Sequence, residues 1–423
     1  MRAAMLFPAA VAMALAAAFV PCAAAEPVPA GPAGTDRAAS GAPRVLCGVC
    51  HPDVRVQFEQ GVHSREGFDC TSCHGGNAAA ATVEAAHRAP FRGTPKRRDI
   101  PALCASCHAD LAMMTPYNIP ADQYALYLTS QHGRRLVKGD ESVAVCTDCH
   151  GVHEIRREND PKSSVFARNV PDTCGRCHGA PPPGSPEGAP PVEGSPFADY
   201  QAGIHGQAYL QQANDSAPTC ASCHGSHGAT PPGVGDVDKV CGQCHATARG
   251  YYRDGPHARA MREGNGPECA HCHGNHRIAR ADVALLDTAC AACHEPGSEM
   301  LKVAGGMKAL IVGAREEIGH AHAAIDRAAA IPLYVEDYKA RLEEAHTALV
   351  QASPIVHALD VGRVEQLAER ARGIAKEVES EIDGKLGERW WRRVGLLLFW
   401  FYLGLTLAVL AVIRRRAREE PGG

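Results

Sequence analysis

Apolar residues are distributed unevenly along the 423-residue chain. Uncharged apolar runs extend from Ala3 to Val20 and from Val394 to Ile413. Between residues 298 and 388, apolar residues recur at intervals of three and four, the spacing of amphipathic helices. In residues 47–297, glycine and proline are so frequent that only short helices joined by loops are expected. The pattern predicts a mainly α protein with almost no sheet.

Three packed helices are predicted in residues 298–388. Pro332 can open the second helix, which would end near Ala352, and Ser353-Pro354 can start the third. The stripe of the first helix is Leu301, Ala304, Lys308/Ile311, Ala314, Ile318, Ala321, Ile325 and Ala328, and that of the third is Leu359, Val364, Leu367, Ala371, Ile374, Val378 and Ile382. Stripes with this spacing favour an antiparallel helical bundle.

The two uncharged runs differ in their flanks. Arg2 precedes the first run and Ala23-Ala24-Ala25 follows it, so residues 1–25 are predicted to be a signal peptide, with a flexible Pro/Gly/Ala-rich lead over residues 26–46. A lipid on Cys22 is the weaker alternative, because Pro21 does not suit that signal. The second run, 394–413, would extend about 30 Å as a helix and so span a bilayer.

Arginines at 414–416 and 418 follow that span, in a ten-residue tail over residues 414–423. The positive-inside rule places this tail in the cytoplasm and the rest of the chain outside, although Arg389, Arg392 and Arg393 weaken the charge bias. The sequence therefore predicts a protein of the inner membrane with residues 47–297 in the periplasm.

Nine Cys-x-x-Cys-His motifs occur between residues 47 and 294. In this motif both cysteines attach a c-type haem and the adjacent histidine becomes an iron ligand. The cysteine pairs are Cys47/Cys50, Cys70/Cys73, Cys104/Cys107, Cys146/Cys149, Cys174/Cys177, Cys220/Cys223, Cys241/Cys244, Cys269/Cys272 and Cys290/Cys293, and the histidines are His51, His74, His108, His150, His178, His224, His245, His273 and His294.

Zinc ribbons and redox pairs share the cysteine spacing, but neither requires a histidine directly after the second cysteine. Histidine is only 22 of 423 residues, and all nine motifs end in one, so nine covalently bound haem c groups are predicted. The motifs use 18 of the 19 cysteines, and Cys22 is the other. Aromatic residues are 5% of the chain, too few for an ordinary core, so the porphyrins must form the core. A net charge of −4 gives no indication of nucleic-acid binding.

Further histidines recur around the motifs in repeated units. His153 follows the motif histidine His150 by three residues and lies on the same side of that porphyrin, so it is placed to reach a neighbouring iron instead. Each complete unit has an upstream histidine, a first motif, a histidine three residues after it, and a second motif. The three complete units begin at His132, His205 and His257; an earlier, degenerate unit begins at His63, with Asn77 in place of the expected histidine; and Cys47–His51 stands alone in front.

These segments resemble the doubled-CxxCH multihaem c-type cytochromes, a family of electron-transfer proteins. The resemblance is carried by the Cys-x-x-Cys-His-Gly-x-His segments and the upstream His-Gly element, and covers roughly Cys47 to His294. In that family most haems have two histidine ligands. The resemblance implies second iron ligands at His132, His153, His205, His227, His257 and His276 and, by analogy, at His63 and His87.

Eight spare histidines for nine haems leave one iron without an assigned second ligand. His320 or His322, in the first helix of the predicted bundle, is expected to supply it; the alternatives are a methionine or an open position. His271 lies inside its own motif and is not expected to reach across. His346 and His357 are interpreted as ordinary, partly exposed histidines, and Met113 and Met114 as packing residues.

A Pro/Gly-rich segment over residues 179–199 is expected to be a linker or surface loop. It divides the predicted N-terminal haem domain, residues 47–178 with five motifs, from the C-terminal haem domain, residues 200–297 with four.

Together these features predict a membrane-anchored nonahaem cytochrome c that transfers electrons between a quinol-oxidising membrane partner and periplasmic redox proteins. The predicted span contains no histidine, so it cannot hold a b-type haem between two histidines, and a b-type cytochrome or another quinol-oxidising subunit is expected. The alternative is a multihaem reductase or oxidoreductase that acts on a small nitrogen or sulfur compound at an open haem. Several such enzymes mark that haem with lysine in place of the motif histidine, which this chain lacks.

Overall fold

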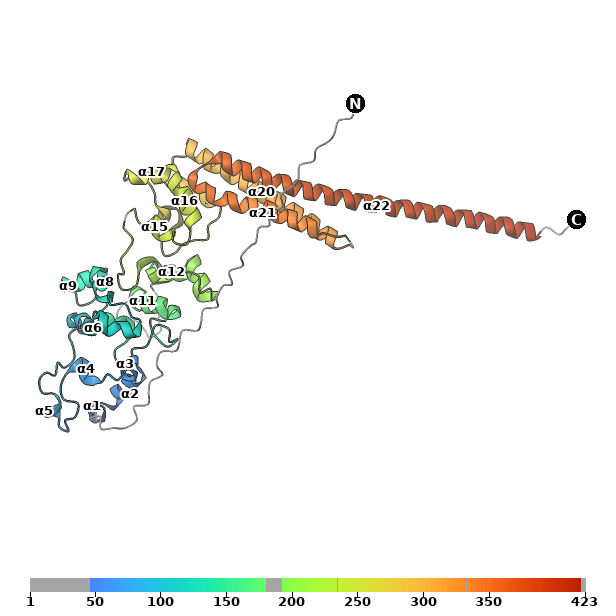
Figure 1. The fold of residues 1–423 in the computed structure, drawn as a ribbon. Coiled ribbons are helices and arrows are strands. Elements are labelled where there is room, and N and C mark those ends of the chain that lie inside the picture. The colour runs from blue at the N-terminus through green and yellow to red at the C-terminus, as the bar shows by residue number, and fades with distance from the viewer. Residues whose placement is uncertain (1–45, 180–191, 234, 332, 420–423) are drawn as a thin grey trace, which may run out of the picture.

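The computed structural model describes residues 46–179, 192–233, 235–331 and 333–419. Within these ranges every regular element is a helix and none is a strand, so the prediction of a mainly α fold is confirmed. The predicted signal peptide and nearly all of the flexible lead lie outside the described residues. The described residues form two parts, which are the motif region, residues 46–297, and a bundle of long helices (Figure 1).

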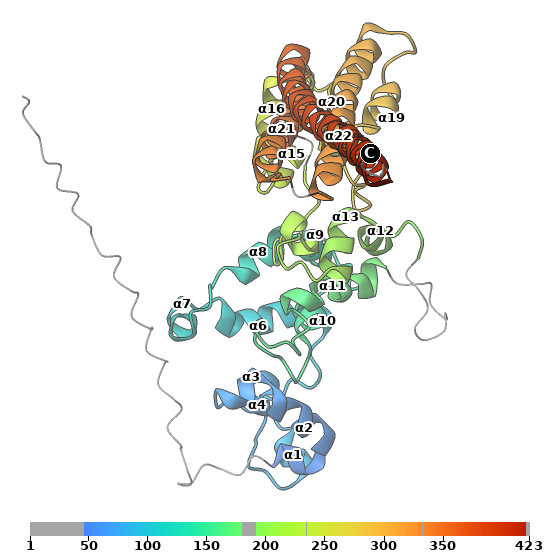
Figure 2. The same cartoon turned by 90° about the vertical axis from the view of Figure 1, so that its right-hand side faces the viewer.

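The motif region extends to one side of the bundle, crosswise to its longest helix, with the first motif at the far end (Figures 1 and 2). Its helices without a motif are α2 (Pro52–Gln60), α3 (Val62–Arg65), α5 (Val83–Ala86), η1 (Arg97–Asp99), α7 (Leu111–Met114), η2 (Thr115–Tyr117), α8 (Gln123–Thr129), α9 (Gln131–Val137), η3 (Ala167–Asn169), α12 (Pro196–Ala202), α13 (Ile204–Gly206), η4 (Gln207–Gln211), α16 (Ala246–Asp254) and α17 (Pro256–Arg262).

The first motif of each doubled unit forms a single-turn helix that begins at the first cysteine and ends at the histidine. These helices are α4 (Cys70–His74), α10 (Cys146–His150), α14 (Cys220–His224) and α18 (Cys269–His273). The next residue is glycine in all four, with φ of 69° at Gly75, 83° at Gly151, 78° at Gly225 and 77° at Gly274. Because other L-residues are strained at such φ, glycine permits the sharp turn that carries the chain away from its own motif.

The other motifs lie at the C-terminal ends of their helices. Two of these helices end at the motif histidine, α6 (Ile100–His108) and α11 (Val170–His178); two end within the motif, α15 (Val237–Cys241) and α19 (Leu285–Ala291); and α1 (Cys47–Cys50) carries the motif in front. Proline at the start of α6 and α11, Pro101 and Pro171, suits a first helical turn, whose N–H groups have no partner inside the helix.

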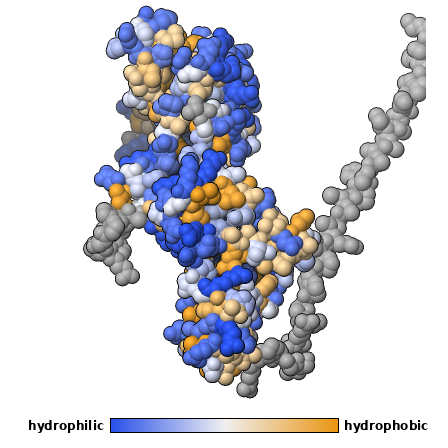
Figure 3. Space-filling view, turned by 90° about the vertical axis from the view of Figure 1, so that its left-hand side faces the viewer, coloured by the Kyte–Doolittle hydropathy of each residue, from blue (hydrophilic) through white to orange (hydrophobic). Residues whose placement is uncertain are grey.

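The motif region has little apolar core of its own. Among the described residues only seven of its apolar side chains are buried, namely Met114, Leu136, Val143, Val145, Tyr200, Tyr209 and Ala258, against twenty-three in residues 304–382. The space-filling view shows apolar patches between polar surface along this part of the molecule (Figure 3). About 250 residues therefore lack the buried area that normally holds a domain together.

The bundle consists of α20 (Glu299–Ala329), α21 (Glu336–Ile355) and α22 (Val361–Glu419), with the short η5 (Val356–Ala358) before α22. Its core contains most of the predicted stripes, without Leu301 and Lys308, together with residues of α21, including Leu342, Ala345 and Ala352. Two predicted boundaries were wrong. The second helix starts at Glu336, and it passes through Ser353-Pro354, because Ala352 and Ile355 are buried and hold its last turn against the core.

α22 also continues without a break from the bundle into the apolar run at 394–413. The connecting residues 383–393 contain Gly384 and Gly387 but no proline, and glycine weakens a helix by only about 1 kcal/mol without removing a hydrogen bond. Large apolar side chains from Trp390 to Ile413 are exposed, and among the described residues α22 is the one helix long and apolar enough to cross a membrane. It is compatible with a membrane anchor.

Two positions of the predicted linker, Gly179 and Val192, lie close together. The Val192 N–H donates to the carbonyl of Gly179 at 3.1 Å, and α12, which begins at Pro196 inside the predicted linker, packs through Phe197 on α11 at Gly175. Residues 180–191 lie outside the described ranges. The division of the array into two domains here stays a prediction.

Replacing Ile325, which is 2% exposed in the bundle core, with alanine should lower the free energy of unfolding of the bundle by about 2–5 kcal/mol, because the cavity left behind loses its packing contacts. Val350→Ala in α21 is the matched control, since Val350 is 56% exposed. Urea unfolding of the full chain in detergent, followed by far-UV circular dichroism, measures both. Equal midpoints for the two variants would contradict the core position of Ile325.

Candidate haem-binding site

All nine motif histidines face a second histidine. The ring pairs are His51/His87, His63/His108, His74/His153, His132/His178, His150/His227, His205/His245, His224/His276, His257/His294 and His273/His357, with centroid separations between 5.8 and 6.4 Å. Each motif histidine occurs in one pair, and each partner lies outside the motifs. The partners include every histidine that the repeat pattern proposed as a second ligand.

These separations fit an iron between two imidazoles. Imidazole nitrogens bind metals at about 2.0–2.1 Å, and the ring centroid lies about 1.1 Å behind the nitrogen, so two axial imidazoles have centroids about 6.3 Å apart. A cavity of about 3320 Å³ runs through the motif region and is lined by the first cysteine of all nine motifs. Pockets for one small ligand hold only about 300–1,000 Å³, so this cavity suits several large cofactors.

The first cysteine of every motif lines this cavity, but two of the second cysteines do not. Cys244 and Cys293 are exposed and do not line this cavity, whereas the second cysteines of the other seven motifs do. α15 and α19 end before the second cysteine, so this residue lies in the turn after the helix. Cys244 still lies near Cys223, and Cys293 near Cys272, in the preceding motifs. Thioether attachment at Cys244 and Cys293 stays a prediction.

The histidine upstream of each unit serves the second motif of the same unit. His63 faces His108, His132 faces His178, His205 faces His245 and His257 faces His294. These four upstream histidines lie at equivalent places in short helices, α3, α9, α13 and α17, each of which follows a turn after a preceding helix. Each doubled unit thus supplies the partner histidine of its own second motif.

The histidine three residues after a first motif serves the preceding unit. His153 faces His74, His227 faces His150 and His276 faces His224. His87 takes the same role in the degenerate unit and faces His51 of the lone motif. The first motif of each unit therefore depends on the next unit along the chain.

Backbone hydrogen bonds accompany this exchange between units. In three of the four units, the residue before the upstream histidine donates its N–H to a carbonyl two residues beyond a partner histidine of the next unit: Val62 to Ile155 at 2.7 Å, Gln131 to Ala229 at 3.1 Å and Ile204 to Ile278 at 2.7 Å. The two kinds of partner histidine thus share one junction. This junction positions both rings at once.

Tyrosines recur in the three complete units and were missed by the sequence analysis. The hydroxyls of Tyr127, Tyr200 and Tyr252 donate to the carbonyls of Ala144, Pro218 and Pro267 at 3.0, 3.0 and 2.9 Å. Each tyrosine precedes its upstream histidine by five residues, and each acceptor precedes a first motif by two. Burial raises the pKa of Tyr127 to about 12, which keeps its hydroxyl a donor. The constant five-residue spacing was the signal that would have revealed them.

Burial favours the neutral form of several of the paired histidines by lowering the pKa. It lowers the pKa of His150 to about 4, with a smaller effect from the neighbouring His227 and His108. It also lowers the pKa of His63, His132 and His276. Because an imidazole must be unprotonated to bind a metal, burial prepares these rings for coordination.

Carbonyl groups orient two of the motif rings. The Nδ1 of His74 lies 2.9 Å from the carbonyl of Gly93, and the Nδ1 of His224 lies 3.1 Å from that of Thr230. A carbonyl only accepts, so Nδ1 carries the proton and Nε2 is left with its lone pair for a metal. Iron-binding histidines need this tautomer.

Neighbouring motifs adjoin in the order of the chain. Cysteine side chains of motifs 1 and 2, 3 and 4, 5 and 6, and 7 and 8 lie close together: Cys47/Cys70, Cys104/Cys146, Cys174/Cys220 and Cys241/Cys269. The alternate steps bring Cys73 near Cys104, Cys149 near Cys174, Cys223 near Cys241 and Cys272 near Cys290. All eight steps are present, so the nine motifs form one continuous series in the order of the chain.

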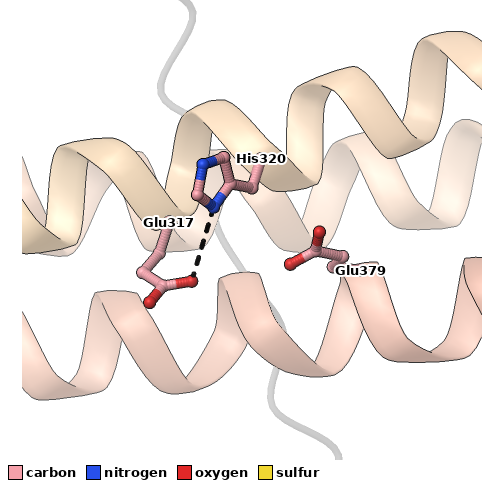
Figure 4. Close-up of side chains that lie close together, drawn as sticks. All are labelled: Glu317, His320 and Glu379. Atoms are coloured by element: carbon pink, nitrogen blue, oxygen red, sulfur yellow. Dashed lines mark ion pairs between the residues drawn. The ribbon is translucent and has the colours of Figure 1, made fainter.

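The remaining histidines separate into one paired and four exposed. The prediction that His320 or His322 completes the ninth pair needs correction, because both are exposed on α20 and His357 of η5 lies opposite His273 instead. His320 lies 4.0 Å from Glu317 of its own helix and near Glu379 of α22 (Figure 4). His271 and His346 are exposed.

This correction follows from which face of α20 is buried. Its buried stripe runs through Ile318, Ala321 and Ile325 toward the bundle core, so neither histidine faces the motif region. His357, interpreted from sequence as an ordinary histidine, lies at the corner between α21 and α22, which touches α16. No local pattern marks it, because it lies outside the repeats.

Comparison with known proteins gives one match. No curated protein and no solved structure matches the chain. Residues 63–113 match the family described as "Doubled CXXCH motif", a range that begins at His63 and includes the motifs at Cys70 and Cys104. The motifs indicate covalently bound haem c. Over residues 63–113 the chain carries the doubled CXXCH motif of that family, which is consistent with a multihaem c-type cytochrome.

Proposed function

We propose that the chain is an exported, membrane-anchored nonahaem cytochrome c. It transfers electrons between a quinol-oxidising partner in the inner membrane, such as a b-type cytochrome, and periplasmic redox proteins. The observation that carries this proposal is that every motif histidine faces a second histidine at the separation that one iron requires.

Bound haem c supplies one-electron exchange at its iron. The two cysteines of each motif would hold the porphyrin covalently, and the motif histidine and its partner would both bind the iron. Imidazole on both sides, in place of methionine, favours low reduction potentials. With both positions filled by the protein, the irons offer no place for a substrate.

The continuous series of adjoining motifs supports electron transfer from one motif to the next along the chain. Contacts between consecutive motifs carry the series from the Cys47 motif, at the end far from the bundle, to the Cys290 motif beside α20. α19, which carries that last motif, packs against α20, where Lys308 pairs with Asp287. One end of the series thus adjoins the bundle, and the other is open to a periplasmic partner.

The length of α22 supports a separate membrane partner. From Val361 to Val394 are 33 residues, which at 1.5 Å per residue extend about 50 Å along the helix. The motif region adjoins the start of α22 and lies crosswise to it (Figures 1 and 2). If α22 crosses the bilayer upright, the series of motifs runs alongside the membrane at a distance. A quinol-oxidising subunit would fill that space.

The rival function, a reductase or oxidoreductase for a small nitrogen or sulfur compound, requires an iron with one open axial position. The structure gives no motif histidine an empty opposite side, since even the motif without a predicted partner has His357. The pairing favours the electron carrier.

The mature protein should carry nine haems, because all nine motifs line one cavity and each has a facing histidine. Intact-mass spectrometry of the purified protein should show nine haem additions on a chain that starts near Glu26. A Cys290→Ala/Cys293→Ala variant should show eight. A wild-type mass with seven or fewer additions would mean that some motifs have another purpose.

The protein should not bind external iron ligands. Adding cyanide or nitrite to the ferric protein, or carbon monoxide to the ferrous protein, should leave the Soret and visible bands unchanged, because both axial positions are filled. Stoichiometric binding of any of these ligands at one iron, followed by turnover of nitrite, hydroxylamine or tetrathionate, would establish the enzyme instead.

Deletion from Val394 onward should release the haem-containing protein from the membrane fraction, because it removes the uncharged run of α22 and most of its exposed apolar side chains. Fractionation of cells that express the full and shortened chains measures this. A variant in which Arg414, Arg415 and Arg416 become glutamine keeps the apolar span and should stay in the membrane. Retention of the shortened chain would indicate that the N-terminal segment is the anchor.

A further inference from the structure

Resting on the proposed function, we infer that His357 is the second axial ligand of the iron held by Cys269, Cys272 and His273. This ligand comes from the helical bundle and lies outside the CxxCH repeats. The bundle is then a part of the haem site in addition to its role as the stalk of the membrane helix.

The ring geometry matches the other pairs. The centroids of His357 and His273 are 6.0 Å apart with an interplanar angle of 26°, close to the 28° of His224/His276 and the 25° of His205/His245. The Nδ1 of His357 lies 3.0 Å from the carbonyl of Pro354. As at His74 and His224, this carbonyl fixes the tautomer that leaves Nε2 for iron.

The backbone around His357 repeats the junction found between units. A Cβ atom added at Gly61 would lie 2.8 Å from the carbonyl oxygen of His153, and one at Gly203 would lie 2.7 Å from that of His276. At Gly255, the equivalent position in the last unit, it would lie 2.7 Å from the carbonyl oxygen of His357. The last upstream segment therefore approaches His357 as the earlier ones approach the histidines of the next unit.

The junction at His357 lacks one backbone hydrogen bond that the other three junctions have. In the other three units the residue before the upstream histidine donates its N–H across the junction, but here that residue is Pro256, which has none. Contacts from the bundle take over. The Arg363 guanidinium lies 5.3 Å from the ring centre of Tyr251, and its Nη2 lies 3.4 Å from the tyrosine hydroxyl. η5 also packs on α16, which carries Tyr251.

His357 also takes the place of a histidine that the repeat cannot supply. Each first motif takes its second histidine from the next unit, and the Cys269 motif belongs to the last unit, so no next unit exists to supply one. The cavity continues to this point, where Val356, His357 and Leu359 line it together with Ile311 and Arg315 of α20. The corner between α21 and α22 thus stands where the missing unit would be.

Replacing His357 with alanine in the full-length protein tests this inference. The variant should keep nine haems by mass, convert one of nine low-spin ferric irons to high-spin in the electron paramagnetic resonance spectrum, and bind one carbon monoxide per molecule when reduced. His346→Ala, His320→Ala and His322→Ala are matched controls from the same bundle and should resemble wild type. Nine low-spin irons in His357→Ala would overturn the inference.

A second variant pair tests the positioning of His357 without removing it. Gly255→Ala places a methyl group against the His357 carbonyl and should weaken the same iron's ligation, with a partial high-spin signal. Gly250→Ala in α16 is the control, since a Cβ there meets nothing within 4 Å. An unchanged spectrum of Gly255→Ala would contradict the role of this junction in positioning His357.

If His357→Ala fails to mature, His357→Met should restore haem loading and raise the reduction potential of one haem. Haem loading without that rise would overturn the assignment of His357.

These outcomes separate the inference from the proposed function. A high-spin iron already present in the wild-type protein would contradict the fully ligated electron carrier. A fully low-spin wild type together with a fully low-spin His357→Ala variant would contradict only the role of His357.

Discussion

Nine pairs of facing histidine rings join side chains that can lie far apart in sequence, and these pairs link the units of the motif region to one another and to the bundle. Four of them close a unit on itself, four reach back from one unit to the motif before it, and one reaches from the bundle. The motif region buries few apolar side chains, so it cannot rely on an ordinary core. Under the proposed function, the haems and their ligands take the place of that core.

The local chemistry of this arrangement was readable from the sequence because each element of it is short. The motifs, the glycine that follows each first motif, and the eight spare histidines all lie within a few residues of a recognisable pattern. Which histidine faces which motif was not readable. His153 serves His74, in the preceding unit, and nothing in the eight residues around His153 states that direction. The turn at Gly151 shows only that the chain leaves its own motif.

The ninth partner was predicted in the wrong helix for a related reason. The apolar stripe of α20 correctly gives the buried face of that helix, but it does not say that this face packs on α21 and α22 instead of on the motifs. The place of His357 depends on two helix limits that differ from the predicted ones. α21 continues through Pro354 to Ile355, and α22 begins at Val361. Those limits are set by burial of Ala352 and Ile355 in the bundle, which outweighs the tendency of proline to start a helix.

The central claim is that nine irons lie between nine named pairs of histidines, in the order of the motifs along the chain. The most direct measurement is an experimental structure of the haem-loaded protein with the iron atoms located by their anomalous scattering. The account predicts nine iron peaks, each between the two histidines of one pair, with the peak at His273 shared with His357. An iron with histidine on one side only, or a motif whose iron neighbours a motif not adjacent to it in sequence, would contradict it.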